Sequence, residues 1–180
     1  MAAVPVPHTF VDGVYTSSEA NTYLRDPLLF LMTPPSAQLR QIVAQNLTTS
    51  VGAAITFTTA DWDTDYLGGT GHSNSVNTSR YTANYQGKYL VAGAVAFAAS
   101  AAGRRLTWWA VNGVTVNASE TAGPTTAASS CEVVARTMEV PLNVNDYVEL
   151  WAQQESGGTI ATNVTFVNAS SHMTILRVGN

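Results

Sequence analysis

The chain has 180 residues, of which only 11% are charged, and its formal net charge is −4 at pH 7. Charged residues make up about 25% of a typical globular protein, so the surface is poor in charge. No basic block is present, which argues against electrostatic binding of nucleic acid. No apolar run reaches membrane-spanning length, and Met1 to Pro7 lacks the features of a secretory signal peptide. With one cysteine, Cys131, no intrachain disulfide can form, so packing or association of subunits must hold the fold.

The N-terminal part of the chain is rich in proline and predicts short helices. Thr16 and Glu19 have the spacing of a capping box, so we expect a helix from about Ser17 to Arg25. Asp26-Pro27 can start a second short piece, which Pro34-Pro35 must end. We therefore predict an N-terminal attachment arm over residues 1–45.

The arm contains four consecutive large apolar residues, Leu28, Leu29, Phe30 and Leu31. Successive helix positions are about 100° apart, so the four side chains cannot all face one small domain. Either the helix packs on the side of its own domain, or the four residues dock against another chain or a larger particle. We expect the second arrangement.

Residues 46–180 read as one all-β domain. Short runs of alternating or β-branched residues are separated by turn residues, and Asn112-Gly113 is the strongest two-residue hairpin signal. The expected strands are Ala54–Thr59, Lys88–Phe97, Arg105–Val111, Val114–Asn117, Glu132–Leu142, Tyr147–Gln153, Val164–Val167 and His172–Val178. This pattern predicts a β-sandwich or jelly roll.

The alternation also predicts which residues are buried. Tyr89, Val91 and Val95 share one face of their strand, and we expect them in the core together with Tyr147 and Leu150. Trp108 and Trp109 point to opposite faces of a strand, so one can fill the sandwich while the other faces a partner.

Four motifs in order resemble a known family: Gly87-Lys88-Tyr89-Leu90-Val91, Gly103-Arg104-Arg105, Val111-Asn112-Gly113, and Asn145-Asp146-Tyr147-Val148-Glu149-Leu150. Together they resemble the jelly-roll domain shared by tumour necrosis factor and the complement globular heads. More narrowly, they are similar to the version in virion proteins of phages that infect actinobacteria. Asn145 stands where that pattern has Gly, and both residues accept a tight turn.

The arm resembles the start of phage tail and virion-surface proteins. The similarity rests on Thr9 to Gly13, on Thr16 with Ala20-Asn21 and Arg25-Asp26, and on Phe30-Leu31 before Pro34-Pro35. In such proteins this end attaches to the particle while the β domain projects.

The resemblance implies a homotrimer, since jelly rolls of this class usually assemble in threes. Aromatic residues are favoured at interfaces, and the chain has four Trp and seven Tyr. The expected subunit interface consists of Trp108, Trp109, Tyr147 and Trp151, although packing in the core is the more common role for a Trp.

The sequence offers few residues for chemistry. Asp61, Asp63 and Asp65 are spaced like the start of a calcium loop, but Tyr66 and His72 stand where an EF-hand needs Gly and Glu. A solvated acidic turn and a calcium site of another kind both remain open. His72 or His172 could meet its copies on a trimer axis, but no metal site within one chain is expected.

No catalytic or cofactor motif is present, so we predict that the protein is not an enzyme and binds no cofactor. The expected function is structural: a trimeric knob on the virion surface, anchored by its arm as a capsid decoration or head-fibre protein. The alternative is a minor tail protein that binds a host-surface glycan through a loop with Trp62 and Tyr66. A bacterial extracellular cytokine-like knob is a third class, which the missing signal peptide disfavours.

Overall fold

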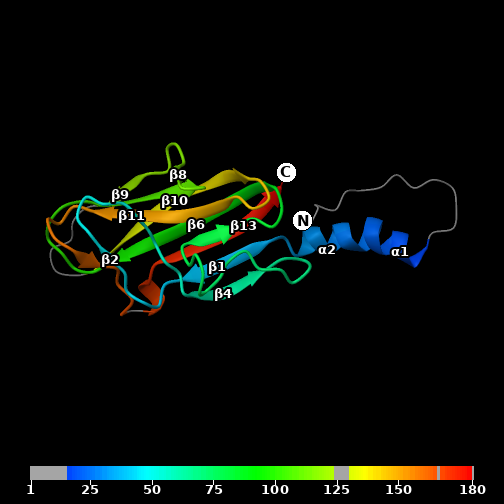
Figure 1. Ribbon diagram of the computed structural model, residues 1–180, viewed down its shortest axis with the longest axis horizontal. Helices are drawn as coiled ribbons and strands as arrows, with labels where there is room; N and C mark the ends of the chain where they lie inside the picture. Colours follow the sequence, from blue (N-terminus) through cyan, green and yellow to red (C-terminus); the bar gives the residue numbers. More distant parts are fainter. Residues whose placement is uncertain (1–15, 124–129, 166, 180) are drawn as a thin grey trace.

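The computed structural model describes residues 16–123, 130–165 and 167–179, and shows a two-layer β-sandwich from which one helix projects (Figure 1). The first sheet has five antiparallel strands in the spatial order β10 (Cys131–Leu142), β6 (Gly87–Phe97), β13 (His172–Gly179), β1 (Ser36–Arg40) and β4 (Thr59–Thr64). The second sheet has the order β3 (Ala53–Ala54), β11 (Tyr147–Gln154), β7 (Arg105–Val111) and β8 (Val114–Thr115). In addition, β5 (Arg80–Thr82) pairs with β11, β9 (Thr121–Gly123) pairs with β7, and β2 (Asn46–Leu47) pairs with β12 (Ile160–Ala161). This arrangement is the predicted jelly roll.

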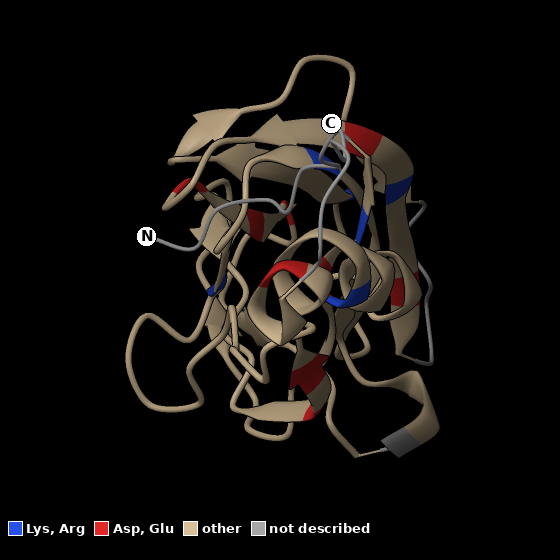
Figure 2. Cartoon of the chain, turned by 90° about the vertical axis from the view of Figure 1, so that its right-hand side faces the viewer, with Lys and Arg blue, Asp and Glu red and all other residues tan. Residues whose placement is uncertain are grey.

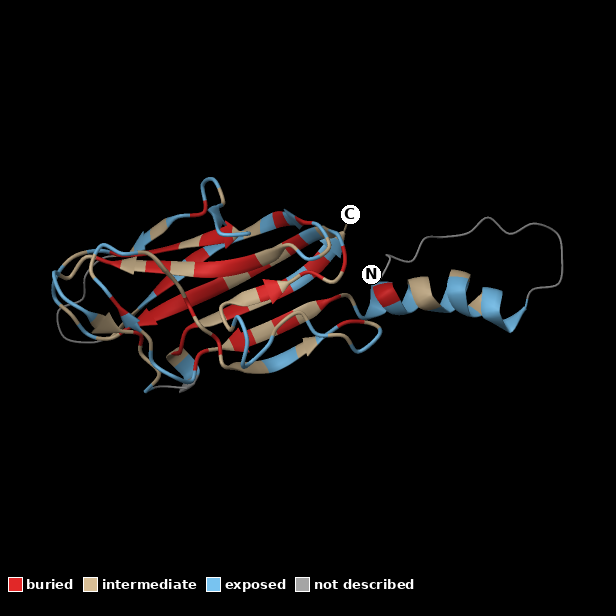
Figure 3. Ribbon diagram, in the orientation of Figure 1, coloured by how far each residue is buried: buried red, intermediate tan, exposed pale blue. Residues whose placement is uncertain are grey.

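The core lies between the two sheets and is lined by alternate residues of the long strands (Figure 3). Tyr89, Val91, Val95 and Leu150 are fully buried there, as predicted. Tyr147 is only half-buried, because it lies on the outward face of β11, next to the buried Val148. The prediction that Tyr147 belongs to the core is therefore wrong.

The Asn112-Gly113 hairpin is confirmed. It joins β7 to β8, and both turn residues have positive φ, 52° at Asn112 and 77° at Gly113. Two successive residues in this region form the turn that matches the right-handed twist of the flanking strands.

The domain boundary expected at residue 45 is too late. The strand β1 (Ser36–Arg40) lies between β13 and β4 inside the first sheet, so the sandwich begins directly after Pro35. Its pairing with the C-terminal strand is a long-range contact that local alternation does not reveal.

Two other expected strands also differ. Ile55 and Phe57 are fully buried, but they lie between β3 and β4 rather than within one strand over Ala54–Thr59. Their backbone N–H groups donate to Leu150 and Thr78 instead of to one continuous partner strand. The range Val164–Val167 contains no strand among its described residues, and the 3₁₀-helix η2 (Val167–Ala169) begins at its end.

The N-terminal helix is longer than predicted. It runs without a break through α1 (Ser17–Ala20), the π-helical turn η1 (Asn21–Arg25) and α2 (Asp26–Met32), and we call residues 17–32 the arm helix. The predicted capping box is confirmed, because Thr16 and Glu19 exchange hydrogen bonds.

Pro27 does not split the arm helix, contrary to expectation. Proline removes one backbone donor and crowds the carbonyl four residues earlier, which normally breaks a helix. Here the N–H of Asp26 donates to the carbonyl of Asn21, five residues back, and this widened turn accommodates the proline. The helix ends at Met32 before Pro34-Pro35, as predicted. No helix among the described residues has the length and apolar character needed to cross a membrane.

Candidate functional site

The base of the arm helix is fixed to the sandwich by Phe30. Its ring is 5% exposed and meets the rings of Tyr66 and Tyr85 edge-on, with centroids 5.2 and 5.3 Å apart. The guanidinium of Arg177 lies 4.6 Å from the centroid of the same ring, an attractive cation–π contact. Phe30 thus closes the end of the sandwich where β13 ends.

Apart from Phe30, the arm helix is exposed or half-buried (Figure 3), and its other large aliphatic residues face solvent. Leu28, Leu29 and Leu31 are 58%, 38% and 75% exposed, so the structure separates them from Phe30. Of the four predicted docking residues, one holds the arm to its own domain and three remain free for a partner.

Two further arm residues belong to this exposed set. Leu24 is 49% exposed and Met32 is 77% exposed. Sequence reasoning missed them because it considered only the unbroken run from Leu28 to Leu31. The spacing of Leu24, Leu28 and Leu31, four and then three residues, was the available signal. The residues from Thr9 to Gly13 of the arm motif lie outside the described part of the chain.

The three aspartates do not form one site. Asp61 makes a 2.9 Å ion pair with Arg40. The carboxylate of Asp63 accepts the backbone N–H groups of Gly71 and His72, at 2.9 and 2.7 Å. Burial raises the pKa of Asp63 despite the two N–H donors.

Asp65 has a different set of partners. Its Oδ1 accepts the backbone N–H groups of Leu67 and Gly69, both at 2.8 Å. Asp63 and Asp65 therefore shape the loop between β4 and β5 rather than converge on a cation. Within the described residues, no group of three or more His, Cys, Asp or Glu side chains is arranged to hold a metal.

His72 is held by the loop and strand backbone on both sides of its ring. Nδ1 lies 2.7 Å from the carbonyl oxygen of Arg80, and Nε2 lies 3.0 Å from that of Phe57. Both nitrogens are thus occupied by carbonyl groups, which suits a structural role better than metal binding. His172 lies at the start of β13, with Nδ1 3.3 Å from the carbonyl oxygen of Ser170 and 3.8 Å from Glu132.

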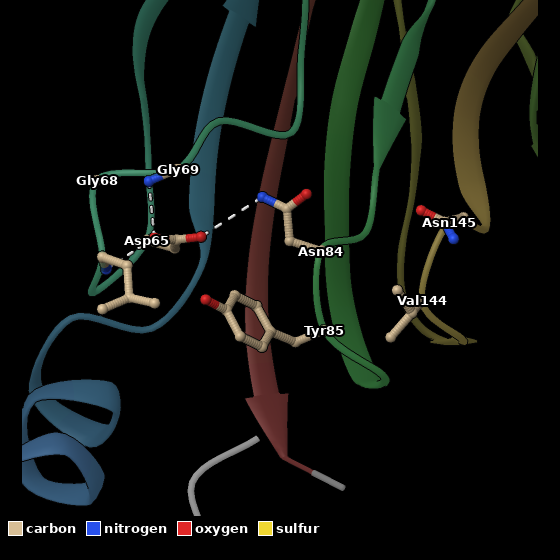
Figure 4. Close-up of a pocket in the computed structure, with 8 residues that line it drawn as sticks. Asp65, Gly68, Gly69, Asn84, Tyr85, Val144 and Asn145 are labelled. Atoms are coloured by element: carbon tan, nitrogen blue, oxygen red, sulfur yellow. Dashed lines mark hydrogen bonds between the residues drawn. The ribbon is translucent and has the colours of Figure 1, made fainter. Parts of the chain in front are cut away.

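A shallow pocket of about 390 Å³ lies beside the arm base (Figure 4). Its lining residues are Asp65, Leu67, Gly68, Gly69, Asn84, Tyr85, Val144 and Asn145. The amide of Asn84 faces Asp65 across it, with Nδ2 donating at 3.4 Å to Oδ2 and at 3.1 Å to the carbonyl of Thr70. Burial raises the pKa of Tyr85, so its phenol stays neutral.

The predicted ligand loop with Trp62 and Tyr66 is not a single loop. Trp62 is an exposed residue of strand β4, opposite Gln38 of β1. Tyr66 lies beyond the end of that strand and packs on Phe30 and Tyr85 at the arm base. The structure therefore assigns the two aromatics to different environments.

The predicted interface tryptophans also have different environments. Trp109 is fully buried between the sheets, where its Nε1 donates to the carbonyl of Arg136 at 2.6 Å, so it is not available to another subunit. Trp108 and Trp151 are half-buried on the outside of the second sheet, with stacked rings 6.0 Å apart. Tyr147 lies on the same side, with the Arg80 guanidinium 3.9 Å from its ring centroid.

We call the face of the five-stranded sheet that is turned away from the core the outer face, and its centre over β6 and β13 is mostly uncharged. There Leu90 lies opposite Leu176 and Ala92 opposite Thr174. The neighbouring strands add charges to this face, Glu132 and Glu139 from β10 and Arg40 from β1. On the other side of β6, Val134 of β10 lies opposite Ala94. Seen from the arm end, the blue and red segments that mark charged residues are scattered and do not gather into one patch (Figure 2).

Comparison with known proteins finds similarity in structure only. No family model matches the sequence, and no curated protein sequence matches it. Among solved structures, murine APRIL at pH 5.0 is similar, with a TM-score of 0.56 and 8% identity, over 80% of this chain and 98% of that chain. Eiger TNF from S. frugiperda is similar over 81% of this chain and 93% of that chain, with a TM-score of 0.54 and 9% identity.

A complement protein belongs to the same set of structural neighbours. The globular domain of zebrafish complement 1qA protein matches 81% of this chain and 99% of its own length, with a TM-score of 0.50 and 13% identity. Identities this low show a common fold and nothing finer. The chain shares the jelly-roll fold of the tumour necrosis factor and complement globular domains.

Proposed function

We propose that this protein is a non-enzymatic structural knob on the surface of a phage virion, a homotrimer of jelly rolls attached through the N-terminal arm as a capsid decoration or head-fibre protein. The virion assignment rests on the sequence resemblance of the jelly-roll motifs and of the arm. The attachment role rests on one structural observation: the arm helix projects from the sandwich (Figure 1), and its Leu29 and Met32 are exposed to solvent.

Exposed leucine side chains are unfavourable in water, and burying them against another surface would favour attachment. Fully burying one leucine side chain stabilises a complex by about 1.5–3 kcal/mol before ordering costs. Phe30 keeps the base of the arm helix in place, so part of the ordering cost is already met in the free protein. The arm is thus prepared to bind another surface while the sandwich points away from it.

The trimer is supported by the outer face of the five-stranded sheet. Apart from Lys88 and His172 near the strand ends, the described residues that β6 and β13 present there are uncharged. Leu176 is exposed on this face, beside the smaller Ala92 and Thr174. The weakly charged centre of this face suits a subunit interface, because little polar surface must be desolvated there on association. We therefore propose this face as the main subunit contact, in place of the expected set of Trp108, Trp109, Tyr147 and Trp151.

The attachment proposal is tested by reconstitution of particles that lack the protein. Deleting residues 1–40 is unsuitable, because that deletion removes β1 from the sheet. The full chain with Leu29→Asp and Met32→Asp keeps the fold, since both side chains are exposed. We expect it to be soluble but to fail to incorporate, whereas Val114→Asp on β8 incorporates normally. Normal incorporation of the arm variant would show that attachment lies elsewhere.

A second candidate function is glycan binding as a minor tail adhesin. The observation that favours it is the pocket beside the arm base, where Asp65, Asn84 and Asn145 supply polar groups. Trp62 is an exposed aromatic on which a sugar could stack, although it does not line this pocket. Pull-down with host cell walls separates the two functions: binding that is lost in Asn84→Ala supports the adhesin, and absence of binding supports a purely structural knob.

A further inference from the structure

Three of the four exposed leucines of the arm helix form one stripe. Leu24, Leu28 and Leu31 are separated by four and three residues, the spacing that places side chains on one side of a helix. Leu24 lies in the widened turn η1, and four residues are close to one turn in either helical geometry. Phe30, which contacts the sandwich, and the exposed Leu29 lie off this stripe.

We propose that the stripe is the seam of a short parallel three-helix bundle, formed by the arm helices of the three subunits of one trimer. Leu24 and Leu31 take the d positions of a heptad pattern and Leu28 takes an a position. Asn21, seven residues before Leu28, takes the preceding a position. One polar residue at an a position is a known device for fixing the register of such bundles.

The exposed leucines of the arm helix give it an apolar side that no described residue of its own chain buries. Helices in proteins are stabilised mainly by packing of an apolar side. Among residues 17–32 only Phe30 is buried, while Leu24, Leu28 and Leu31 are exposed. The bundle buries these three leucines against their copies.

The course of the chain makes this bundle compatible with the proposed trimer, on which the inference rests. Only Thr33, Pro34 and Pro35 separate the arm helix from β1, a strand of the sheet that carries the proposed subunit contact. When subunits meet through this sheet, the ends of their arm helices next to the sandwich lie close together. The three helices then point in the same direction. Leu29 then lies on the outside of the bundle, where it remains available to the particle.

Disulfide cross-linking of the full chain tests the bundle directly. Leu24→Cys is made in a Cys131→Ser background, since Cys131 is a free, half-exposed thiol. Thr22→Cys in the same background is the matched control, because it lies two residues away and thus on the opposite side of the helix. Under mild oxidation at micromolar protein, we expect linked dimers at least about tenfold faster for Leu24→Cys than for Thr22→Cys.

A pair of charge variants gives a second, independent measurement. Leu24→Asp with Leu28→Asp should raise the concentration at which the trimer dissociates by at least about tenfold and reduce the helical circular dichroism signal. Leu29→Asp, off the stripe, should change neither.

The results of these experiments distinguish failure of the bundle proposal from failure of the trimer proposal. If the wild type is a trimer but Leu24→Cys links no faster than Thr22→Cys, the bundle is refuted and the trimer stands. If the wild type has the mass of a single chain, 19.0 kDa, at micromolar concentration, the trimer itself is refuted and the bundle with it.

Discussion

The side-chain amide of Asn112 donates a 2.7 Å hydrogen bond to the carboxylate of Asp146, which joins the β7–β8 turn to the turn before β11. The same Asn112 accepts the backbone N–H of Tyr147 through Oδ1 at 3.0 Å. Asp146 also accepts the backbone N–H of Asn143 at 2.7 Å. These donors, Asn112 foremost, hold the pKa of the Asp146 carboxyl below its ordinary value.

The lowered pKa of Asp146 predicts a stability difference that depends on pH. A carboxyl whose pKa is lower in the folded state contributes stability above its ordinary pKa, and the contribution is lost as the pH falls through the lowered value. We expect Asp146→Asn to reduce the free energy of unfolding at pH 7, and the gap to the wild type to close below about pH 4. Urea denaturation of both proteins between pH 7 and pH 2.5 measures the gap. A gap that is constant over this range would contradict the assigned role of the carboxylate.

Arg105 stabilises the loop before β7 from inside the protein. It is almost fully buried, and its Nη1 donates to the carbonyls of Ala102, Gly103 and Arg104 at 3.0–3.1 Å. Nη2 also donates to the carbonyl of Ser100 at 3.4 Å, and a lysine ammonium, with a single nitrogen, cannot occupy both places of this planar fork. We therefore expect Arg105→Lys to lower the free energy of unfolding by about 1–3 kcal/mol, the cost of leaving buried carbonyls without a donor.

The neighbouring arginine is the matched control for this prediction. Arg104 is exposed and pairs with Glu155 at 2.9 Å on the surface. Exposed pairs contribute little, so Arg104→Lys should leave the thermal midpoint unchanged. Equal midpoints for the two lysine variants in differential scanning calorimetry would show that the hydrogen bonds of Arg105 do not stabilise the fold.

Phe30 should stabilise the junction of the arm with the sandwich. Truncating a buried phenylalanine costs about 3–5 kcal/mol, and we expect Phe30→Ala to be near the low end because the junction lies at the end of the sandwich. Hydrogen exchange should also speed up in α2, since the helix loses its contact with Tyr66 and Tyr85. The control is Leu29→Ala, whose side chain is exposed and lies off the leucine stripe. Unchanged exchange in α2 of Phe30→Ala would mean that other contacts hold the arm.

Local patterns in the sequence were sufficient to predict the long strands. The alternation around Tyr89 to Val95 and the Asn112-Gly113 turn both depend on residues that are adjacent in the chain, so they could be recognised without a structure. The strand β1 was missed because its neighbours, β13 and β4, are set by pairing over long sequence distances. Tyr147 was misplaced because its strand β11 is largely buried on both sides, so alternation did not distinguish the inward side.

In the arm too, features set by neighbouring residues could be predicted, and features set by contacts with distant residues could not. Helix geometry correctly implied that Leu28, Leu29, Phe30 and Leu31 could not all face one domain. Which residue faces the sandwich depends on Tyr66 and Tyr85, which follow much later in the chain, and no local pattern identifies Phe30. The stacked pair Trp108 and Trp151 likewise exists only because β7 and β11 are paired in register.

The proposed subunit contact can be tested with one substitution on the outer face. Leu176 lies opposite Leu90 in the middle of that face and is exposed in the single chain. A charge placed in a buried interface without a partner is strongly unfavourable, so we expect Leu176→Glu to be a folded monomer at micromolar concentration. Val114→Glu changes an apolar position on β8 of the other sheet that is more exposed, 70% against 37%, and should keep three times the chain mass of 19.0 kDa in light scattering. Circular dichroism verifies that both variants are folded. A Leu176→Glu protein that remains trimeric would show that the subunits meet through another surface, and the half-buried Trp108 and Trp151 would then be the next residues to test.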